Sequence, residues 1–282
     1  NYLKNIDNVT IDDIKRVANK YFKLDNGQII ITGKASELLE KIDNVKFDGK
    51  IIPISYYDNY GNKVEKPKKP EIPSNITANS VLENYIKSIG GREKLNDVKS
   101  LILKYQGEAM GASIISEEKR LNNKLANSTS MNGNVMMKMV VTENEAFVKQ
   151  GPNKMALPEN IQNDMKKSLG IFPELNLLNN PNVKFGGKEN VDGKEAYAVE
   201  VAGDFISLKY LYDVETGKKI REISTTNMGG QSQVQESVIG DYKDFDGILF
   251  PLKKSQSLGP QKIEMTLIDV IINQDFAEND FN

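Results

Sequence analysis

The sequence predicts an α+β protein whose larger part is a curved or closed antiparallel sheet of about nine to eleven strands. In the last two thirds of the chain, apolar residues alternate with polar ones, as at Leu101, Leu103 and Tyr105, which is the period of a half-buried strand. Turn signals such as Asn132-Gly133-Asn134 separate successive runs. One segment, 158–169, has helical spacing instead and predicts a helix that covers the concave face or the open end of the sheet.

The N-terminal part of the chain predicts a small αβαβ unit. Thr10 is a good N-cap for a helix that runs to Tyr21, with two aspartates in its first turn. The almost wholly apolar run 28–33 predicts a strand buried on both faces, because a half-exposed strand would alternate. A short helix capped by Ser36 and an extended segment at 51–57 complete the unit.

A segment rich in proline and lysine, 63–76, predicts a solvated linker. Proline and mutually repelling lysines both favour an extended chain with few contacts. The predicted domains are therefore 1–62 and 77–282, with the linker between them. The alternative is one long surface loop within a single domain.

The larger domain is expected to begin with a helix and to continue as strands. Thr77 or Asn79 caps this helix, and Gly90-Gly91 ends it. The clearest alternating runs that follow lie at 101–105, 135–141, 197–201, 206–212 and 263–267.

The composition removes most catalytic chemistry. The 282 residues include no histidine, no cysteine and no tryptophan, so the chain has no imidazole base, no thiolate nucleophile and no His or Cys ligand for zinc. We therefore expect no enzyme activity and no cofactor in this chain. A net charge of −2 argues against a nucleic-acid partner, and no apolar run approaches the roughly 18 residues of a membrane-spanning helix.

The strands and the helix at 158–169 predict an apolar cavity between them. Methionines are prominent in this region, and flexible thioether side chains suit a cavity that adapts to apolar ligands. The alternative is that these residues only fill the core. The candidate ligand-binding residues are Leu101, Leu103, Tyr105, Met137, Met139, Ile161, Met165, Leu208 and Tyr210.

Residues 8–22, from Asn8-Val9-Thr10-Ile11-Asp12 to Asn19-Lys20-Tyr21-Phe22, precede an apolar run that ends in Ile31-Thr32-Gly33-Lys34. This arrangement resembles the closing helix and strand of an insulinase/pitrilysin-type (inverzincin) zinc peptidase domain. The family's H-x-x-E-H signature requires histidines, so no site residue carries over to this chain. The resemblance implies that zinc belongs to a missing catalytic part or a partner subunit, and that a peptidase domain or subunit is a partner.

A second resemblance covers the region from Val81 to the end of the chain. It rests on 81–91, which ends in Ser88-Ile89-Gly90-Gly91, and on 241–251, which includes Asp246-Gly247-Ile248-Leu249-Phe250-Pro251. These stretches resemble the outer-membrane lipoprotein-sorting (LolA-like) proteins. The resemblance implies an unclosed antiparallel half-barrel whose concave apolar face is plugged by helices, a location in the periplasm or the outer-membrane-associated cell envelope, and a lipid or acyl-chain ligand.

Together these expectations describe the C-terminal part of a bacterial cell-envelope protein of the insulinase family. In it, a non-catalytic peptidase remnant precedes a half-barrel that binds acyl chains or another apolar ligand. One alternative is a structural or interaction domain with a filled core, which positions an active zinc metallopeptidase. Another is that this region forms the substrate-cradling end of a working peptidase.

Overall fold

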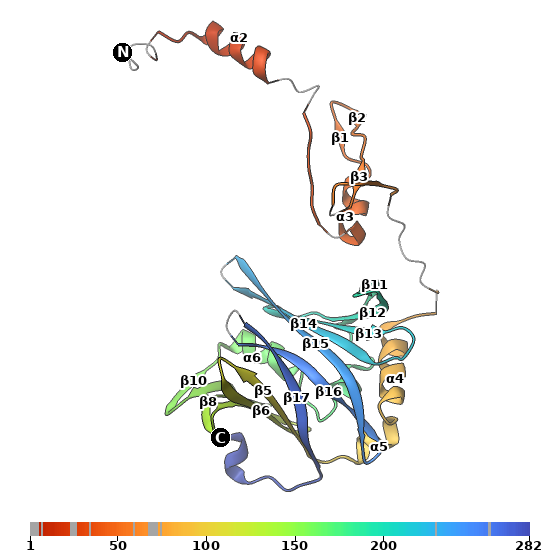
Figure 1. Cartoon of the computed structure of the whole chain (residues 1–282), viewed down its shortest axis with the longest axis vertical. Coiled ribbons are helices and arrows are strands. Elements are labelled where there is room, and N and C mark those ends of the chain that lie inside the picture. The colour runs from red at the N-terminus through yellow and green to blue at the C-terminus, as the bar shows by residue number, and fades with distance from the viewer. Residues whose placement is uncertain are drawn as a thin grey trace. The chain divides into compact units, whose positions relative to one another are not determined.

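The computed structural model describes residues 6, 8–22, 27–33, 35–58, 60–66, 73, 75–228, 230–258 and 261–282. The chain divides into two compact units, residues 1–69 and 70–282 (Figure 1). The first unit contains the helices α2 (Ile11–Tyr21) and α3 (Ala35–Ile42). The strands among its described residues form two short antiparallel pairs, β1 (Lys46–Phe47) with β2 (Lys50–Ile51), and β3 (Tyr56–Tyr57) with β4 (Lys63–Val64).

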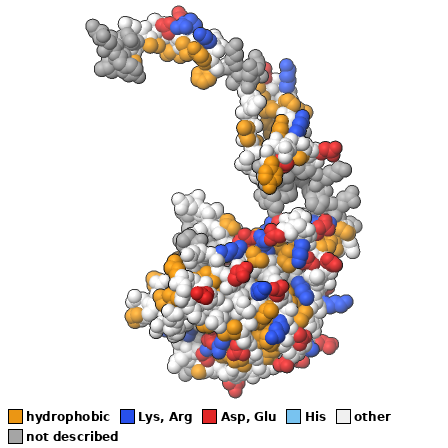
Figure 2. Space-filling view, in the orientation of Figure 1, with side chains coloured by type: hydrophobic (Ala, Val, Ile, Leu, Met, Phe, Trp, Pro, Cys, Tyr) orange, Lys and Arg blue, Asp and Glu red, His pale blue; other side chains and the backbone are white. Residues whose placement is uncertain are grey.

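The helix α2 confirms its predicted position and cap. The Thr10 hydroxyl accepts a hydrogen bond from the Asp13 backbone N–H, and the Asp13 carboxylate accepts one from the Thr10 N–H in return. This capping box satisfies two donors that a helix start leaves free. The apolar residues Ile11, Ile14 and Val17 are nevertheless exposed on its surface, as Figure 2 shows for the apolar side chains of this helix.

The predicted buried strand at 28–33 is wrong. Residues 27–33 form no strand, and Ile29, Ile30 and Ile31 are 76%, 82% and 56% exposed. The reason is that the described part of this unit offers only pairs of two-residue strands, and these are too short to cover a strand on both faces. In the described residues of this unit, the predicted αβαβ order is therefore replaced by α2, α3 and two short strand pairs.

The predicted extended segment and the start of the predicted linker also differ from the structure. The segment 51–57 is divided, because β2 ends at Ile51 and β3 begins at Tyr56. Lys63 and Val64, which the linker was expected to include, pair with β3 instead. Residues 67–72 and 74 of the predicted linker lie outside the described residues.

The second unit opens with two helices, α4 (Ala78–Ser88) and α5 (Arg92–Asp97). Thr77 caps α4 through a capping box with Ser80, which confirms the predicted helix start. The chain then forms a 13-stranded antiparallel sheet, two strands more than the upper end of the prediction. Its strands are β5 (Leu101–Ala109), β6 (Ala112–Leu121), β7 (Lys124–Met131), β8 (Asn134–Thr142), β9 (Ala146–Gln150), β10 (Asn153–Ala156), β11 (Val183–Val191), β12 (Lys194–Val201), β13 (Ile206–Asp213), β14 (Lys219–Met228), β15 (Gln231–Phe245), β16 (Ile248–Leu258) and β17 (Gln261–Ile272).

The order of the strands leaves the sheet open. β5 to β10 form one meander and β11 to β17 form another, and the last strand, β17, pairs with β5 to join the two. β10 and β11 are consequently the two edges, although they are neighbours in the sequence of strands. The connection between them runs over residues 157–182. Its part 157–178, which contains α6 (Glu159–Lys166) and α7 (Pro173–Leu177), is called the strap.

The main core lies between the inner face of this curved sheet and the helices α4 and α7. Leu82, Tyr85 and Ile86 of α4 are buried there, with Leu177 of α7 and Met265 of β17. A 3-10 helix, η2 (Glu278–Phe281), packs near β7 and buries Phe281 in a smaller cluster. Among the described ranges, no helix has the length and apolar character needed to cross a membrane.

Candidate functional site

Charged side chains lie on the inner face of the half-barrel. Residues paired across neighbouring strands point to the same face of a sheet. Leu103 pairs with Glu118, and Leu101 pairs with Arg120, so both charges share the face of the buried core residue Leu101. Tyr210 pairs with Glu222, and Met265 pairs with Lys254. With Lys219 of β14 and Glu174 of α7, these form what we call the inner charge network: Glu118, Arg120, Glu174, Lys219, Glu222 and Lys254.

Lys219 connects the sheet to α7. Its Nζ lies 2.7 Å from a carboxylate oxygen of Glu174 and 2.5 Å from one of Glu222. Lys219 and Glu174 are only 8% and 4% exposed, and the ammonium also lies 4.8 Å from the centre of the Tyr210 ring. Burial by itself lowers the pKa of Lys219, but the two carboxylates outweigh it and hold that pKa well above its ordinary value.

Arg120 connects the sheet to the middle of the strap. Its Nε donates to a Glu118 carboxylate oxygen at 2.5 Å, and its Nη1 donates to the carbonyl oxygens of Ser168 and Gly170 at 3.2 and 2.9 Å. Burial by itself raises the pKa of Glu118. The charges of Arg120 and Lys254, together with the hydrogen bond from Arg120, overcome it and bring that pKa to about 2.

We expect the second unit to lose stability in acid as Glu118 takes up a proton. Its pKa is about 2 in the folded protein against an ordinary value of 4.5, so the ion pair stabilises the fold fully above pH 4.5. That stabilisation, about 3 kcal/mol, is lost as the pH falls through 2. Urea unfolding of the wild type and of Glu118→Gln between pH 7 and pH 2 measures it. The interpretation fails if both proteins lose the same free energy of unfolding between pH 4.5 and 2.

Two side chains of α6 attach it to opposite parts of the sheet. In the middle of α6, the Gln162 side chain accepts from the backbone N–H of Ala146, at the beginning of β9, at 3.0 Å. In its last turn, the buried Asp164 carboxylate accepts from the backbone N–H groups of Asp204, Phe205 and Ile206, just before and at the start of β13, at 3.2, 2.7 and 2.9 Å. The strap is therefore held by polar contacts at both sides of the half-barrel, which confirms the predicted plugging helix between strands.

The structure places the nine predicted ligand-binding residues in different surroundings. Leu101, Leu103, Tyr105, Leu208 and Tyr210 contribute to the main core beneath α4 and α7. Met165 of α6 packs in a separate cluster with Leu125, Val141, Ala146 and Leu169. Ile161 and Met139 are half-buried, and Met137 is 40% exposed. Five of the nine thus lie together, and the methionines do not join them.

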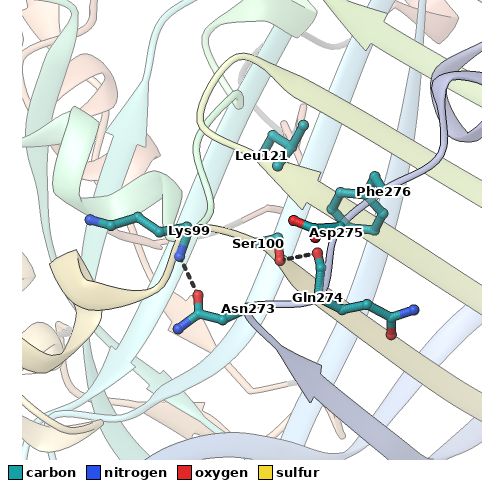
Figure 3. A pocket seen from close by; sticks show the side chains of 7 residues that line it. All are labelled: Lys99, Ser100, Leu121, Asn273, Gln274, Asp275 and Phe276. Atoms are coloured by element: carbon teal, nitrogen blue, oxygen red, sulfur yellow. Dashed lines mark hydrogen bonds between the residues drawn. The ribbon is translucent and has the colours of Figure 1, made fainter.

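Two pockets elsewhere in the second unit were not predicted. One, of about 230 Å³, lies where β17 ends (Figure 3). There the Asn273 side chain accepts from the Lys99 backbone N–H, and the Ser100 hydroxyl donates to the Gln274 carbonyl, both at 2.6 Å. The other, of about 540 Å³, lies beside the start of α4 and is lined by Ile76, Thr77, Ala78, Asn79, Asn179, Asn180, Val183 and Phe185.

The zinc implied by the insulinase resemblance has no fitting set of donors here. The chain contains no histidine or cysteine, and the described residues include no group of three or more acidic side chains placed to hold a metal ion. Zinc prefers nitrogen and sulfur ligands, so the residues of this chain do not fit that ion.

The second unit is therefore an open antiparallel half-barrel with an internal charge network and a strap between its edges. No family model and no curated protein matches the chain. The solved structures similar to it include a LolA superfamily protein from Nitrosomonas europaea, with 12% identity, a TM-score of 0.48, and coverage of 73% of this chain and 98% of that one. A DUF1329 family protein from Desulfovibrio piger has 10% identity, a TM-score of 0.44, and coverage of 72% and 96%. The lipoprotein LppX of Mycobacterium tuberculosis has 10% identity, a TM-score of 0.26, and coverage of 71% and 97%.

Proposed function

We propose that the half-barrel binds an amphiphilic ligand, such as a lipid or a free acyl chain with a polar end, on its inner face beneath the strap. The observation that carries this proposal is a row of apolar side chains that begins two strands away from Glu118 of the inner charge network and runs on the same face to the edge of the sheet. An amphiphile needs both surfaces in one continuous site.

The cross-strand register defines that row. Glu118 pairs with Asn127, Asn127 with Met139, Met139 with Val148, and Val148 with Met155. The last three residues, which we call the methionine row, share one face and continue to the edge strand β10. Four strand spacings separate Glu118 from Met155, a distance of about 19 Å.

The methionine row is accessible. Met139 and Val148 are half-buried, and Met155 is 51% exposed. Thioether side chains adapt to flexible apolar partners, and α6 packs against β8, the strand of Met139. An acyl chain lying along the row would replace this exposed apolar surface by contacts with the protein.

The structural alternative has its own support. Leu101, Tyr105 and Tyr210 are almost fully buried, and within the main core they contact other side chains of the chain. A half-barrel with this filled core could serve to position another domain. On either alternative, the location in the bacterial cell envelope and the insulinase-type parent protein stay predictions.

Binding of a dansyl-labelled undecanoic acid to the full 282-residue chain tests the proposal. We expect saturable binding, and we expect Met139→Glu to weaken it by about tenfold or more, because the bound acyl chain would bury a carboxylate in the apolar row. Met110→Glu is the matched control, since Met110 is 87% exposed in the turn between β5 and β6. Absence of saturable binding, or equal affinity of the two variants, would favour the structural alternative.

A further inference from the structure

We propose that Lys254 selects the ligand by pairing with an anionic group, a carboxylate or a phosphate, at its polar end. This inference rests on the proposed amphiphile function and adds the charge and the position of the head group.

Lys254 differs from the other two cations of the inner charge network. Arg120 contacts Glu118, and Lys219 contacts Glu174 and Glu222. For Lys254, in contrast, no ion pair or hydrogen bond is formed with any of the described residues. Its Nζ lies 3.9 Å from the centre of the Tyr105 ring, a cation–π contact that leaves the hydrogen-bond donors of the ammonium available.

A second polar group without a partner is a neighbour of the same tyrosine, Tyr105, that Lys254 contacts. The Ser116 side-chain oxygen is buried, and among the described residues it has no hydrogen-bond partner. Ser116 pairs across the strands with Tyr105, whose ring Lys254 contacts. Buried hydroxyls are normally hydrogen-bonded. An oxyanion placed between the two would accept from the ammonium and from the hydroxyl.

The charges facing Lys254 are consistent with this role. The carboxylates of Glu118 and Glu222 both attract the ammonium of Lys254. Each of them already contacts another cation of the network, because Glu118 pairs with Arg120 and Glu222 pairs with Lys219. Arg120 also faces it and repels it. Burial is the largest influence and lowers the pKa of Lys254 below its ordinary 10.5. A bound anion would compensate an ammonium that the protein leaves without direct contact to a carboxylate.

The experiment compares dansyl-labelled undecanoic acid with its methyl ester and with a lysophosphatidic acid of similar chain length. We expect Lys254→Met to weaken binding of the acid by about ten- to a hundredfold, the usual range for a charge-assisted hydrogen bond, and to leave binding of the ester unchanged. Lys254→Arg should retain most of the affinity for the acid. Lys253→Met is the matched control, because the exposed Lys253 pairs with Asp241 at 2.9 Å.

The wild-type protein provides a test that does not depend on folding of a variant. Because burial lowers the pKa of free Lys254 below its ordinary value, the affinity for the acid should fall as the pH rises into the alkaline range and Lys254 loses its proton, while the affinity for the ester should not. The order of affinity between acid and lysophosphatidic acid identifies which anion the site prefers.

The outcomes separate the two proposals. If acid and ester bind equally well, with no pH dependence and no effect of Lys254→Met, the half-barrel binds amphiphiles and the inference about Lys254 is wrong. If Lys254→Met weakens binding of the acid and of the ester equally, Lys254 has a structural role, and this result also overturns the inference. If no probe binds the wild type, the proposed function itself fails.

Discussion

Replacement of Arg120 by Met should lower the free energy of unfolding of the second unit by about 3 to 5 kcal/mol. The substitution removes the partner of Glu118 and leaves its carboxylate without a direct cation in a half-buried position. It also removes the donor shared by the Ser168 and Gly170 carbonyls, so the middle of the strap loses its attachment to β6. A neutral side chain of similar length supplies neither contact.

Urea unfolding of the full chain, followed by circular dichroism, measures this effect. The double variant Glu118→Gln, Arg120→Met should recover part of the loss, because it no longer buries an uncompensated charge. Arg92→Met is a suitable control. Arg92 is exposed and lies 3.6 Å from Glu83, so its loss should change stability by less than about 1 kcal/mol. A stability of Arg120→Met equal to that of the control would mean that the network does not hold the strap.

Replacement of Lys219 by Met should have an effect of similar size, about 3 to 5 kcal/mol. Glu174 is then left without its ammonium partner in an almost fully buried position on α7. The cation–π contact with Tyr210 is lost as well. The unpaired Glu174 carboxylate is more stable in water than in the core, so we expect α7 to detach from the sheet before the strands separate.

Hydrogen exchange of the backbone amides in 173–178, together with urea unfolding, distinguishes local detachment of α7 from unfolding of the whole second unit. Protection in α7 should fall more than protection in β13 and β14. Adding Glu174→Gln to Lys219→Met should restore part of the stability, since the isolated buried charge is removed. Lys184→Met, on the exposed Lys184 of β11, serves as control. Uniform loss of protection in α7, β13 and β14 would contradict the local detachment of α7.

Local sequence features determined several elements correctly. Thr10 and Thr77 start α2 and α4 through capping boxes formed with residues three positions along the chain. The alternation of apolar residues identified an antiparallel sheet, and the helical spacing at 158–169 located α6. Each of these depends on interactions among residues close in sequence, or on burial of one face of a single element.

The inner charge network was not predictable in this way. In β6, charged residues occupy both faces: Glu117 and Lys119 alternate with Glu118 and Arg120. The pattern therefore cannot tell which pair points inward. The exposure of the apolar run at 28–33 was not predictable either. Its burial was inferred from composition, but the described part of its unit contains no sheet that this run joins as a strand.

By itself the sequence determined the class of the second unit, its first helix and the helix between its two edge strands, because periodicity and capping are local. The tertiary structure alone decided that β17 joins β5, which makes one open sheet from two meanders. It also decided that Arg120 reaches the Gly170 carbonyl and Lys219 reaches Glu174, over 50 and 45 residues of chain. The physical reason is that a buried charge is stabilised only by its partners, and the strap that carries Gly170 and Glu174 meets Arg120 of β6 and Lys219 of β14 only in the folded half-barrel.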